Sequence, residues 1–286
     1  MRRRILACAV LLVSACAALT ACSSSGGSGA GSTGGAAGSK TITIGVVSDL
    51  TGVASSGFIT DVKGIQAYAN RINAAGGVNG YKIKYVVGDT TSTPTGALTA
   101  VQALVQHDNV FAIVENSSVF YGAEAYALRA GIPVVGDAID GPIWTDPKNT
   151  NLFAAAGVLN QSYTILALGR FMKSQGATKC ASIGYSSSVS SQQSASGFIK
   201  SCETAGLKSG YLNNQVPFGS TDVGPIALAM KAAGVDGVYL PIDPSTAFAL
   251  VAALHQLGVK LKSVLLATGY GGDLLASKAA VQAAQT

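Results

Sequence analysis

Two short polar segments hold the side chains best suited to bind a small ligand. One is 115–118 (Glu-Asn-Ser-Ser), which follows an apolar stretch, and the other is 136–140 (Gly-Asp-Ala-Ile-Asp), which follows the next apolar stretch. Hydroxyl and free backbone N–H groups before a helix suit a carboxylate or another acceptor, whereas a carboxylate can pair with an ammonium group. The two segments therefore predict a small polar ligand. We expect four of their residues to contact it: Ser117, Ser118, Asp137 and Asp140.

Both segments also have a simpler structural interpretation. Ser118 would cap the helix that follows, because serine is a preferred N-cap residue. Asp-x-x-Asp-Gly-Pro at 137–142 is an ordinary composition for a solvated turn. Capping and ligand binding can coexist at one residue, so the sequence leaves both interpretations open.

Alternating strands and helices must position these segments. Residues 41–47 alternate and then become continuously apolar, as in a strand buried in a parallel sheet. Apolar residues between 58 and 72 recur at helical spacing. A Gly-Gly pair at 76–77 ends that helix, and Asn-Gly at 79–80 turns the chain into a second strand at 81–87. The stretch is therefore a predicted βαβ unit.

The same alternation continues to the end of the chain. Further strands are expected at 111–114, 132–135, 152–154, 180–185, 210–216, 238–240 and 263–267. Further helices are expected at 94–106, 120–129, 162–173, 192–204, 225–233, 246–257 and 272–284. This order predicts an α/β fold of parallel sheets flanked by helices.

Ligands of open parallel sheets bind at the carboxyl ends of the strands, where loops meet helix N-termini. The loops at that edge are expected at 48–57, 115–120, 136–141, 185–191, 241–245 and 268–273. They add five candidate contact residues: Ser55, Ser56, Tyr185, Asp243 and Tyr270.

The first βαβ unit carries a recognisable pattern. It consists of Ile44-Gly45-Val46, Leu50-Thr51-Gly52, Gly64, the run Ile-Asn-Ala-Ala-Gly-Gly-Val-Asn-Gly at 72–80, and Asp89. This pattern resembles the type I periplasmic binding proteins, and most closely the leucine/isoleucine/valine-binding branch that serves ABC importers. The run at 72–80 is the specific part. The resemblance implies two lobes of parallel sheet that close around a ligand.

The resemblance also implies roles for the loops. The family's serine-containing loop, here 115–118, holds the α-carboxylate of the bound amino acid. Asp140 stands where the family has Thr. The family's second-lobe aromatics are absent around 185–190 and 242–244, and its acidic residue is absent near 268–272, although Tyr270 would cover a ligand face. The resemblance therefore implies the fold but not branched-chain amino acid specificity.

Domain boundaries follow from the same comparison with the family. Lobe 1 is expected over 40–140, and a crossover plus lobe 2 over 141–286. The Gly- and Pro-containing stretch 137–151 is the candidate crossover. The family crosses between lobes three times, and the chain ends at Thr286 on a predicted helix of lobe 2. We therefore expect the C-terminal part of lobe 1 to be missing and the chain to be a fragment.

The N-terminal segment predicts export. Arginines at 2–4 precede an apolar run at 5–19, which is shorter than a membrane-spanning helix and typical of a signal peptide. Leu-Thr-Ala-Cys ending at Cys22 matches the bacterial lipobox, which predicts a signal peptide over 1–21 and a lipid anchor on Cys22. A second match ends at Cys16, and an ordinary secretory signal is the alternative. A Ser/Gly-rich flexible tether is expected over 22–39.

Two cysteines remain in the exported chain. Cys180 begins a predicted strand, and Cys202 lies at the end of the helix that follows and runs back beside it. An oxidising compartment favours a disulfide between them. Two buried free thiols are the alternative, because cysteine is a common core residue.

Charge and motifs exclude several classes of protein. The net charge of +5 falls to +2 when the three arginines of the export signal are removed, which leaves 16 Lys and Arg against 14 Asp and Glu. No basic patch remains for nucleic acid. His107 lies at the end of a predicted helix and His255 lies inside one, and no nucleophile elbow, phosphate loop, dinucleotide fingerprint or metal-ligand cluster is present. We therefore predict a protein that is not an enzyme and needs no cofactor or metal.

Three functions remain in order of preference. The first is a lipid-anchored, extracytoplasmic solute-binding protein that delivers a small polar ligand, an amino acid or a related compound, to an ABC permease. The second is a sensory lipoprotein on the same fold that signals to a membrane partner. The third is a secreted α/β enzyme, which the absent motifs disfavour.

Overall fold

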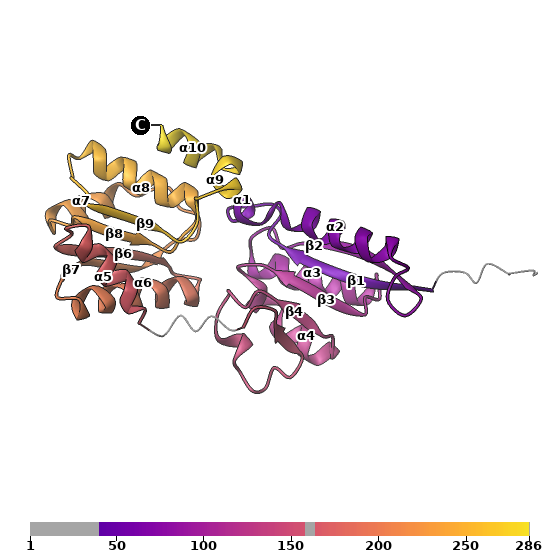
Figure 1. Cartoon of the computed structure of the whole chain (residues 1–286). Helices are drawn as coiled ribbons and strands as arrows, with labels where there is room; N and C mark the ends of the chain where they lie inside the picture. Colours follow the sequence, from indigo (N-terminus) through magenta and orange to yellow (C-terminus); the bar gives the residue numbers. More distant parts are fainter. Residues whose placement is uncertain (1–39, 158–163, 286) are drawn as a thin grey trace, which may run out of the picture. The chain divides into compact units, whose positions relative to one another are not determined.

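Two parallel sheets form the framework of the chain (Figure 1). The computed structural model describes residues 40–157 and 164–285. The predicted signal peptide, lipobox and tether at 1–39 lie outside the described residues. Among those that are described, no helix combines the length and hydrophobicity that spanning a membrane would require.

The first sheet has the strand order β2-β1-β3-β4-β5, with every neighbouring pair parallel. Its strands are β1 (Lys40–Ser48), β2 (Tyr81–Asp89), β3 (Ala112–Asn116), β4 (Val134–Gly136) and β5 (Leu152–Ala154). The connecting helices are α1 (Ser55–Phe58), α2 (Asp61–Ala74), α3 (Pro94–Gln106), η1 (Phe120–Gly122), α4 (Glu124–Ala130) and η2 (Pro142–Trp144). The predicted βαβ unit is confirmed, and α3 begins and ends where the sequence pattern placed it.

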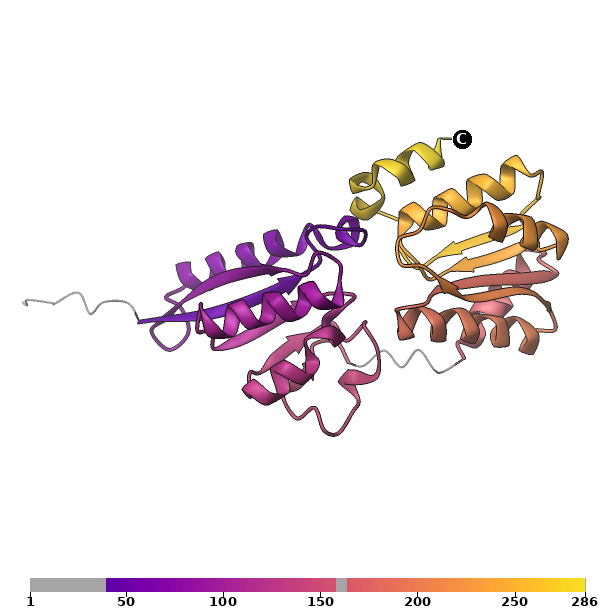
Figure 2. The same cartoon turned by 180° about the vertical axis from the view of Figure 1, so that it is seen from behind.

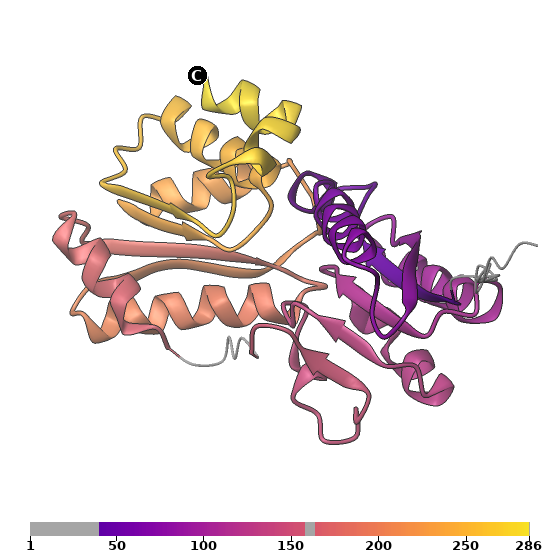
Figure 3. The same cartoon turned by 45° about the vertical axis from the view of Figure 1, so that its right-hand side comes forward.

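The second sheet has the order β7-β6-β8-β9 and is also parallel. Its strands are β6 (Lys179–Tyr185), β7 (Lys208–Val216), β8 (Gly237–Leu240) and β9 (Ser263–Leu266). Its helices are α5 (Leu166–Ser174), α6 (Val189–Thr204), α7 (Gly224–Ala232), α8 (Pro244–Gln256), α9 (Gly272–Ala276) and α10 (Lys278–Ala284). Figure 3 shows α6 running alongside β6 and β7.

The two faces of the second sheet are both packed. On one face Ile183 and Val238 lie in a core with Leu250 of α8. On the other face Met172 of α5 packs with Phe198 of α6. Helices on both faces are the expected solution for parallel strands with continuously apolar sequences (Figure 2).

The first sheet is packed more heavily on one face than on the other. Its described core joins Val47, Leu104 and Ile113 to Phe120 and Trp144. The helix predicted as amphipathic, α2, buries only its Ala69 side chain. Val135 in β4 and Phe153 in the edge strand β5 stay exposed. The α2 side of this sheet therefore carries little of the described core.

The predicted crossover at 137–151 differs from the structure. Trp144 is buried, and its ring centroid lies 6.1 Å from that of Phe120. β5 then pairs with β4, so the chain adds a strand to the first sheet after residue 140. Gly141-Pro142 and Asp146-Pro147 resemble a linker in composition, but the buried indole holds the segment against the first core. The boundary expected at residue 140 therefore falls inside the part of the chain that builds the first sheet.

Two helices at the second sheet also differ from their predicted extents. The single helix expected at 272–284 is split into α9 and α10 at Ser277, whose Oγ accepts a hydrogen bond from the Ala280 N–H (3.2 Å). The helix expected from 162 begins at Leu166, and residues 162–163 lie outside the described residues. Ser277 caps α10 because its hydroxyl competes with the backbone for helical hydrogen bonds.

A disulfide joins Cys180, in β6, to Cys202, in α6. The two Cα atoms are 6.6 Å apart, and both side chains are fully buried. The helix runs antiparallel to the strand it follows, which brings its C-terminal end beside the start of that strand. The predicted pair is thus joined in the structure.

Candidate functional site

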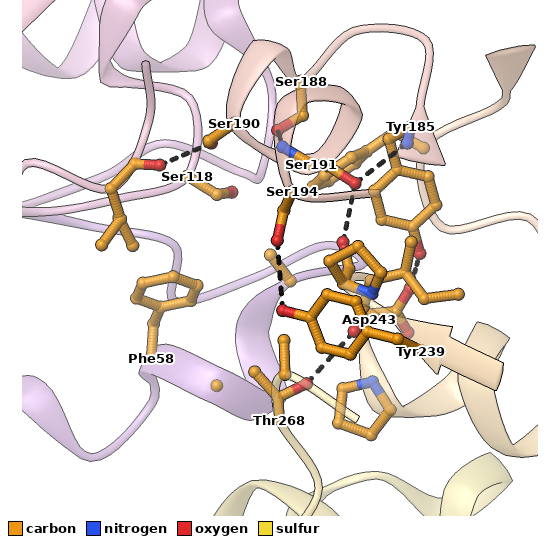
Figure 4. Close-up of a pocket in the computed structure, with 18 residues that line it drawn as sticks. Phe58, Ser118, Tyr185, Ser188, Ser190, Ser191, Ser194, Tyr239, Asp243 and Thr268 are labelled. Carbon is orange, nitrogen blue, oxygen red and sulfur yellow. Dashed lines mark hydrogen bonds between the residues drawn. The ribbon is translucent and has the colours of Figure 1, made fainter. Parts of the chain in front are cut away.

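A cavity of about 340 Å³ lies at the carboxyl ends of strands from both sheets (Figure 4). Its walls come from the segments that follow β1, β3 and β4 in the first sheet and from the ends of β6, β7, β8 and β9 in the second. The volume is within the range of pockets that hold small molecules. The polar side chains in its lining are those of Ser118, Tyr185, Ser188, Ser190, Ser191, Ser194, Tyr239, Asp243 and Thr268. The apolar lining includes Phe58, Ile139, Phe218, Ile242 and Pro244.

Asp49 organises the first-sheet side of the cavity. It follows β1 directly and is fully buried. Its Oδ1 accepts hydrogen bonds from the hydroxyls of Thr90 and Ser117 (2.6 Å from Ser117). Its Oδ2 accepts from both the backbone N–H (2.9 Å) and the hydroxyl (2.6 Å) of Ser118. One carboxylate therefore ties together the loops after β1, β2 and β3.

Ser188 and Ser191 organise the second-sheet side, at the start of α6. The Ser188 hydroxyl caps the helix by accepting a hydrogen bond from Ser191 N (3.3 Å). The Ser191 hydroxyl accepts from the N–H of Tyr185 (3.1 Å) and donates to the carbonyl of Pro241 (2.6 Å). Serine at these positions thus joins the ends of β6 and β8 to the first turn of α6.

Asp243 is the acidic side chain of the cavity lining. It is the N-cap of α8, where its Oδ1 accepts hydrogen bonds from Ser245 N (2.8 Å) and Thr246 N (3.2 Å). Its Oδ2 accepts from the hydroxyls of Thr246 (2.8 Å) and Tyr185. Burial raises the pKa of Asp243, and the hydrogen bonds from Thr246 and Ser245 oppose that rise.

Asp140 lies outside the cavity lining. It is buried, and its two carboxyl oxygens accept hydrogen bonds from Tyr121 N (2.7 Å) and the Trp144 indole N–H (2.6 Å). Burial raises the pKa of Asp140 to about 6, although the bond from Trp144 opposes the rise. In the structure this carboxylate holds η1 and η2 together, and its burial differs from the solvated turn that the composition of its segment suggested.

The other predicted contacts occupy different places. Ser118, Tyr185 and Asp243 line the cavity, and Ser117 lies just behind it on Asp49. Ser55 donates its hydroxyl to the carbonyl of Gly52 (2.9 Å). Tyr270 is 71% exposed and accepts a hydrogen bond from Leu266 N (2.9 Å). Three further candidates are outside the lining: Ser55, Ser56 and Tyr270.

Asp137 belongs to a second depression, beside α2 and the ends of β3 and β4. Asp61 and Glu115 line that depression with it. Burial raises the pKa of Glu115 well above its usual value, and the nearby Asp140 carboxylate adds to the rise. Within 40–157 and 164–285, no three or more His, Cys, Asp or Glu side chains are arranged to hold a metal ion.

Sequence reasoning missed several residues of the cavity. Phe218 packs edge-on against Tyr185, with ring centroids 4.8 Å apart, and it lies in the loop after β7, which was not among the six candidate loops. Tyr239 lies within β8, where its hydroxyl forms a hydrogen bond with that of Ser194 (3.1 Å). The loops 185–191, 241–245 and 268–273 were correctly placed at this edge. Residues inside a strand or in the second turn of a helix gave no comparable signal.

Comparisons with known proteins extend this description. A family model described as "Periplasmic binding protein" matches residues 41–286. A curated amino acid binding protein of Pseudomonas aeruginosa is 33% identical over 119 residues, which cover 41% of this chain and 32% of that relative. The chain thus spans about a third of the length of the curated relative that it matches.

Solved structures show the same fold. The substrate-binding protein LivJ of Streptococcus pneumoniae, solved with isoleucine, is 23% identical with a TM-score of 0.68, covering 84% of this chain and 68% of its own. The leucine-binding protein LivK of Thermotoga maritima is 19% identical with a TM-score of 0.71, covering 84% and 67%. A solute-binding protein of R. palustris, solved with 4-hydroxybenzoate, is 20% identical with a TM-score of 0.65, covering 80% and 62%.

These findings agree with the resemblance seen in the sequence. The family consists of ligand-binding proteins, in agreement with the prediction of a protein that is not an enzyme, and it implies a location outside the cytoplasm. The predicted α/β fold of parallel sheets flanked by helices is confirmed. The chain belongs to the periplasmic binding protein family, with a type I fold like that of the leucine/isoleucine/valine-binding proteins.

Proposed function

We propose that the chain is a solute-binding protein that captures a small polar ligand, an amino acid or a related compound, for an ABC importer. The cavity at the carboxyl ends of the strands is the observation that carries this proposal. Open parallel sheets bind ligands at that edge. Relatives whose names or ligands refer to amino acids support the proposed ligand class.

The proposed mechanism is closure of two lobes around the ligand. Each lobe would contribute contacts: Ser118 from the first sheet, and Tyr185 and Asp243 from the second. A ligand that touches both lobes stabilises the closed arrangement by its differential affinity for it. The remaining predicted contacts, Ser117 and Asp140 among them, would act by holding the loops in place.

A thermal-shift screen of the full chain tests the proposal. The panel contains branched and polar amino acids, amides, amines, small carboxylates and sugars. A ligand present at a hundred times its dissociation constant adds about 2.7 kcal/mol to the free energy of unfolding, which raises Tm by several degrees in a domain of this size. A cooperatively unfolding protein that responds to nothing in the panel would contradict small-ligand capture.

The proposed anchor and partner have separate tests. We propose that Cys22 is lipidated and attaches the protein to the outer face of the cell membrane. The variant Cys22→Ala should leave the membrane fraction, whereas Cys16→Ala should stay in it. Cross-linking in ligand-loaded cells should recover the permease of an ABC importer, and recovery of a sensor protein instead would contradict transport.

A further inference from the structure

Most hydroxyl groups of the cavity lining already donate their hydrogen within the protein. Ser118 donates to Asp49 Oδ2 (2.6 Å). Figure 4 shows two further cases, in which Ser190 donates to the carbonyl of Ile139 (2.6 Å) and Thr268 to the carbonyl of Ile242 (3.2 Å). A hydroxyl has one hydrogen to donate and two lone pairs that accept. These three side chains therefore offer a ligand acceptors only.

Hydroxyl groups deeper in the second-sheet side of the cavity also donate their hydrogens within the protein. Ser191 donates to the carbonyl of Pro241 (2.6 Å), and Tyr185 donates to Asp243. Ser194 and Tyr239 share one hydrogen bond, so one of these two hydroxyls keeps a hydrogen for a ligand. The Ser188 hydroxyl, which accepts from Ser191 N, is a second donor of this kind. A lining that is rich in hydroxyls is thus poor in hydrogen-bond donors.

Two places suited to an anion are already occupied by carboxylates of the chain itself. The N–H and hydroxyl of Ser118, in the loop expected to hold a ligand carboxylate, both point to Asp49. The N-terminal N–H groups of α8, at Ser245 and Thr246, point to Asp243. A ligand carboxylate would have to displace a buried protein carboxylate from either place, which costs free energy.

The charge of the site has the same sign throughout. Asp243 is in the lining, and Asp49 lies directly behind Ser118. No Lys, Arg or His side chain is among the described residues of the lining. A carboxylate in this cavity would meet two negative charges without a counter-charge, whereas a cation would be attracted by both.

We propose that the cavity takes a ligand that presents an ammonium group or amide N–H donors, carries no free carboxylate and has a compact apolar body. This inference rests on the proposed function and narrows its ligand class. The N–H donors meet the lone pairs of Ser118, Ser190 and Thr268 and the charge of Asp243. The apolar body packs between Phe58, Ile139 and Phe218.

The first turn of α6 is the one feature that favours the opposite charge. Its N–H groups at Val189 and Ser190 have no intrahelical partner, because the helix begins at Val189. The helix dipole adds a partial positive charge there. A carboxylate ligand would bind at this turn, so the test must compare ligands that differ only in their charged groups.

Four probes with one apolar body make that comparison. Leucine carries both charged groups, leucinamide has its carboxylate replaced by an amide, 3-methylbutylamine lacks the carboxylate, and 4-methylpentanoate lacks the ammonium group. Dissociation constants are measured by titration calorimetry on the full chain at pH 7. We expect leucinamide and 3-methylbutylamine to bind about tenfold more tightly than leucine, and 4-methylpentanoate not to bind.

A matched pair of variants tests whether the charge of Asp243 attracts the amine. Asp243→Asn keeps an N-cap residue on α8 and removes the charge, so affinity for 3-methylbutylamine should fall about tenfold. Asp236→Asn removes the same charge from the residue that precedes β8, outside the cavity lining, and should leave that affinity unchanged. Equal losses in both variants would mean that the net charge of the protein, and not the cavity, attracts the amine.

The possible outcomes distinguish a failure of this inference from a failure of the proposed function. Tighter binding of leucine or 4-methylpentanoate than of the amine overturns the inference and leaves solute capture intact. If none of the four probes binds but a carboxylate or a sugar in the thermal-shift panel does, the inference is again overturned and the proposed function stands. If no ligand in the whole panel binds to the folded protein, both the inference and the proposed function are overturned.

Discussion

The carboxyl edges of the two sheets are held together in different ways. In the first sheet, Asp49 and Asp140 are buried carboxylates whose hydrogen-bond donors come from other loops, up to 69 residues away in the chain. In the second sheet, Asp243 accepts two hydrogen bonds from the backbone of the helix that it begins and a further one from the hydroxyl of Tyr185. The disulfide between Cys180 and Cys202 lies at the opposite edge of that sheet, where β6 begins. Buried acids with donors from distant residues thus stabilise the carboxyl edge of the first sheet, whereas the second sheet has a helix cap at its carboxyl edge and a covalent bond at the opposite edge.

This difference predicts how each edge responds to change. When a buried acid that accepts hydrogen bonds from several distant residues is removed, all of its donors lose their partner at once. A local cap costs only the hydrogen bonds of its own turn. The carboxyl edge of the first sheet should therefore be sensitive to single substitutions and to pH, and the second sheet as a whole should be sensitive to reduction.

The largest effect is expected from Asp49→Ala. The substitution leaves the hydroxyls of Thr90, Ser117 and Ser118 without their shared acceptor, and we expect a loss of about 4 kcal/mol in the free energy of unfolding. Urea unfolding of the full chain measures it. Asp243→Ala is the matched control, with an expected loss of about 2 kcal/mol. Equal losses at the two aspartates would remove the contrast between the edges.

The second-largest loss of stability is expected when the disulfide is removed. Its cysteines are 22 residues apart in the chain, and closing a loop of that length stabilises the folded state by about 3 kcal/mol in the chain-entropy model. Unfolding by urea with and without dithiothreitol should show this loss. A variant with both Cys180→Ala and Cys202→Ala should be insensitive to the reductant. Hydrogen exchange should increase in β6 and α6 and stay unchanged in β1, and a change in β1 would contradict separate stabilisation.

The pH dependence of the first edge follows from Asp140. Its folded pKa is about 6 and its ordinary value is 3.8, so the folded state holds a proton more tightly than the unfolded state between these values. This stabilisation is fully present below about pH 4 and is lost as pH rises through about 6, a fall of about 3 kcal/mol. In Asp140→Asn this part of the slope should be absent, whatever the new baseline. An unchanged slope would assign the dependence to Glu115, whose pKa is also raised by burial.

Asp236 provides a control of opposite sign. Burial works against it, but hydrogen bonds from Lys179 and Thr178 lower the pKa of Asp236. Its contribution is present above the ordinary pKa and is lost as pH falls. Asp236→Asn should therefore leave the slope between pH 4 and 6 unchanged and lessen the loss of stability in stronger acid.

The smallest effect is expected at the helix caps. Ser188→Ala removes the cap of α6, and Thr93→Ala removes the cap of α3, whose hydroxyl accepts from Gly96 N (2.9 Å). Each should cost about 1 kcal/mol, since each removes one capping bond. Differential scanning calorimetry compares the two. A much larger loss at Ser188 would show that the first turn of α6 supports more than its own helix.

Local signals explain what the sequence could predict of the fold. The Thr93-Pro94 pair marks the start of α3, because threonine caps the helix and proline suits its first turn. The Gly-Gly pair after α2 adopts positive φ angles, +106° at Gly76 and +87° at Gly77, which side chains disfavour. Such signals need only neighbouring residues, and they placed the strands and most helices correctly.

Long-range contacts explain what it could not predict. The segment 137–151 has the composition of a linker, but contacts with distant residues hold it in the first core. Trp144 packs near Phe120, Asp140 accepts a hydrogen bond from Tyr121 N, and Asn149 donates to Glu124. The hydroxyl of Ser118 was expected to face a ligand carboxylate, but its hydrogen goes to Asp49, 69 residues earlier. The direction of a hydroxyl hydrogen depends on an acceptor that sequence spacing does not reveal.

The disulfide has a mechanical consequence for the cavity. It fixes α6 at Cys202, near its C-terminal end, whereas Ser188 and Ser191 lie at the other end, on the cavity. The helix of 16 residues is about 24 Å long. A small tilt of the helix about the disulfide therefore produces a large displacement at the serines. At the cavity end the helix is held by the hydrogen bonds of Ser191 with Tyr185 and Pro241. Substitutions there can reshape the cavity wall while the disulfide keeps the helix in register with its strand.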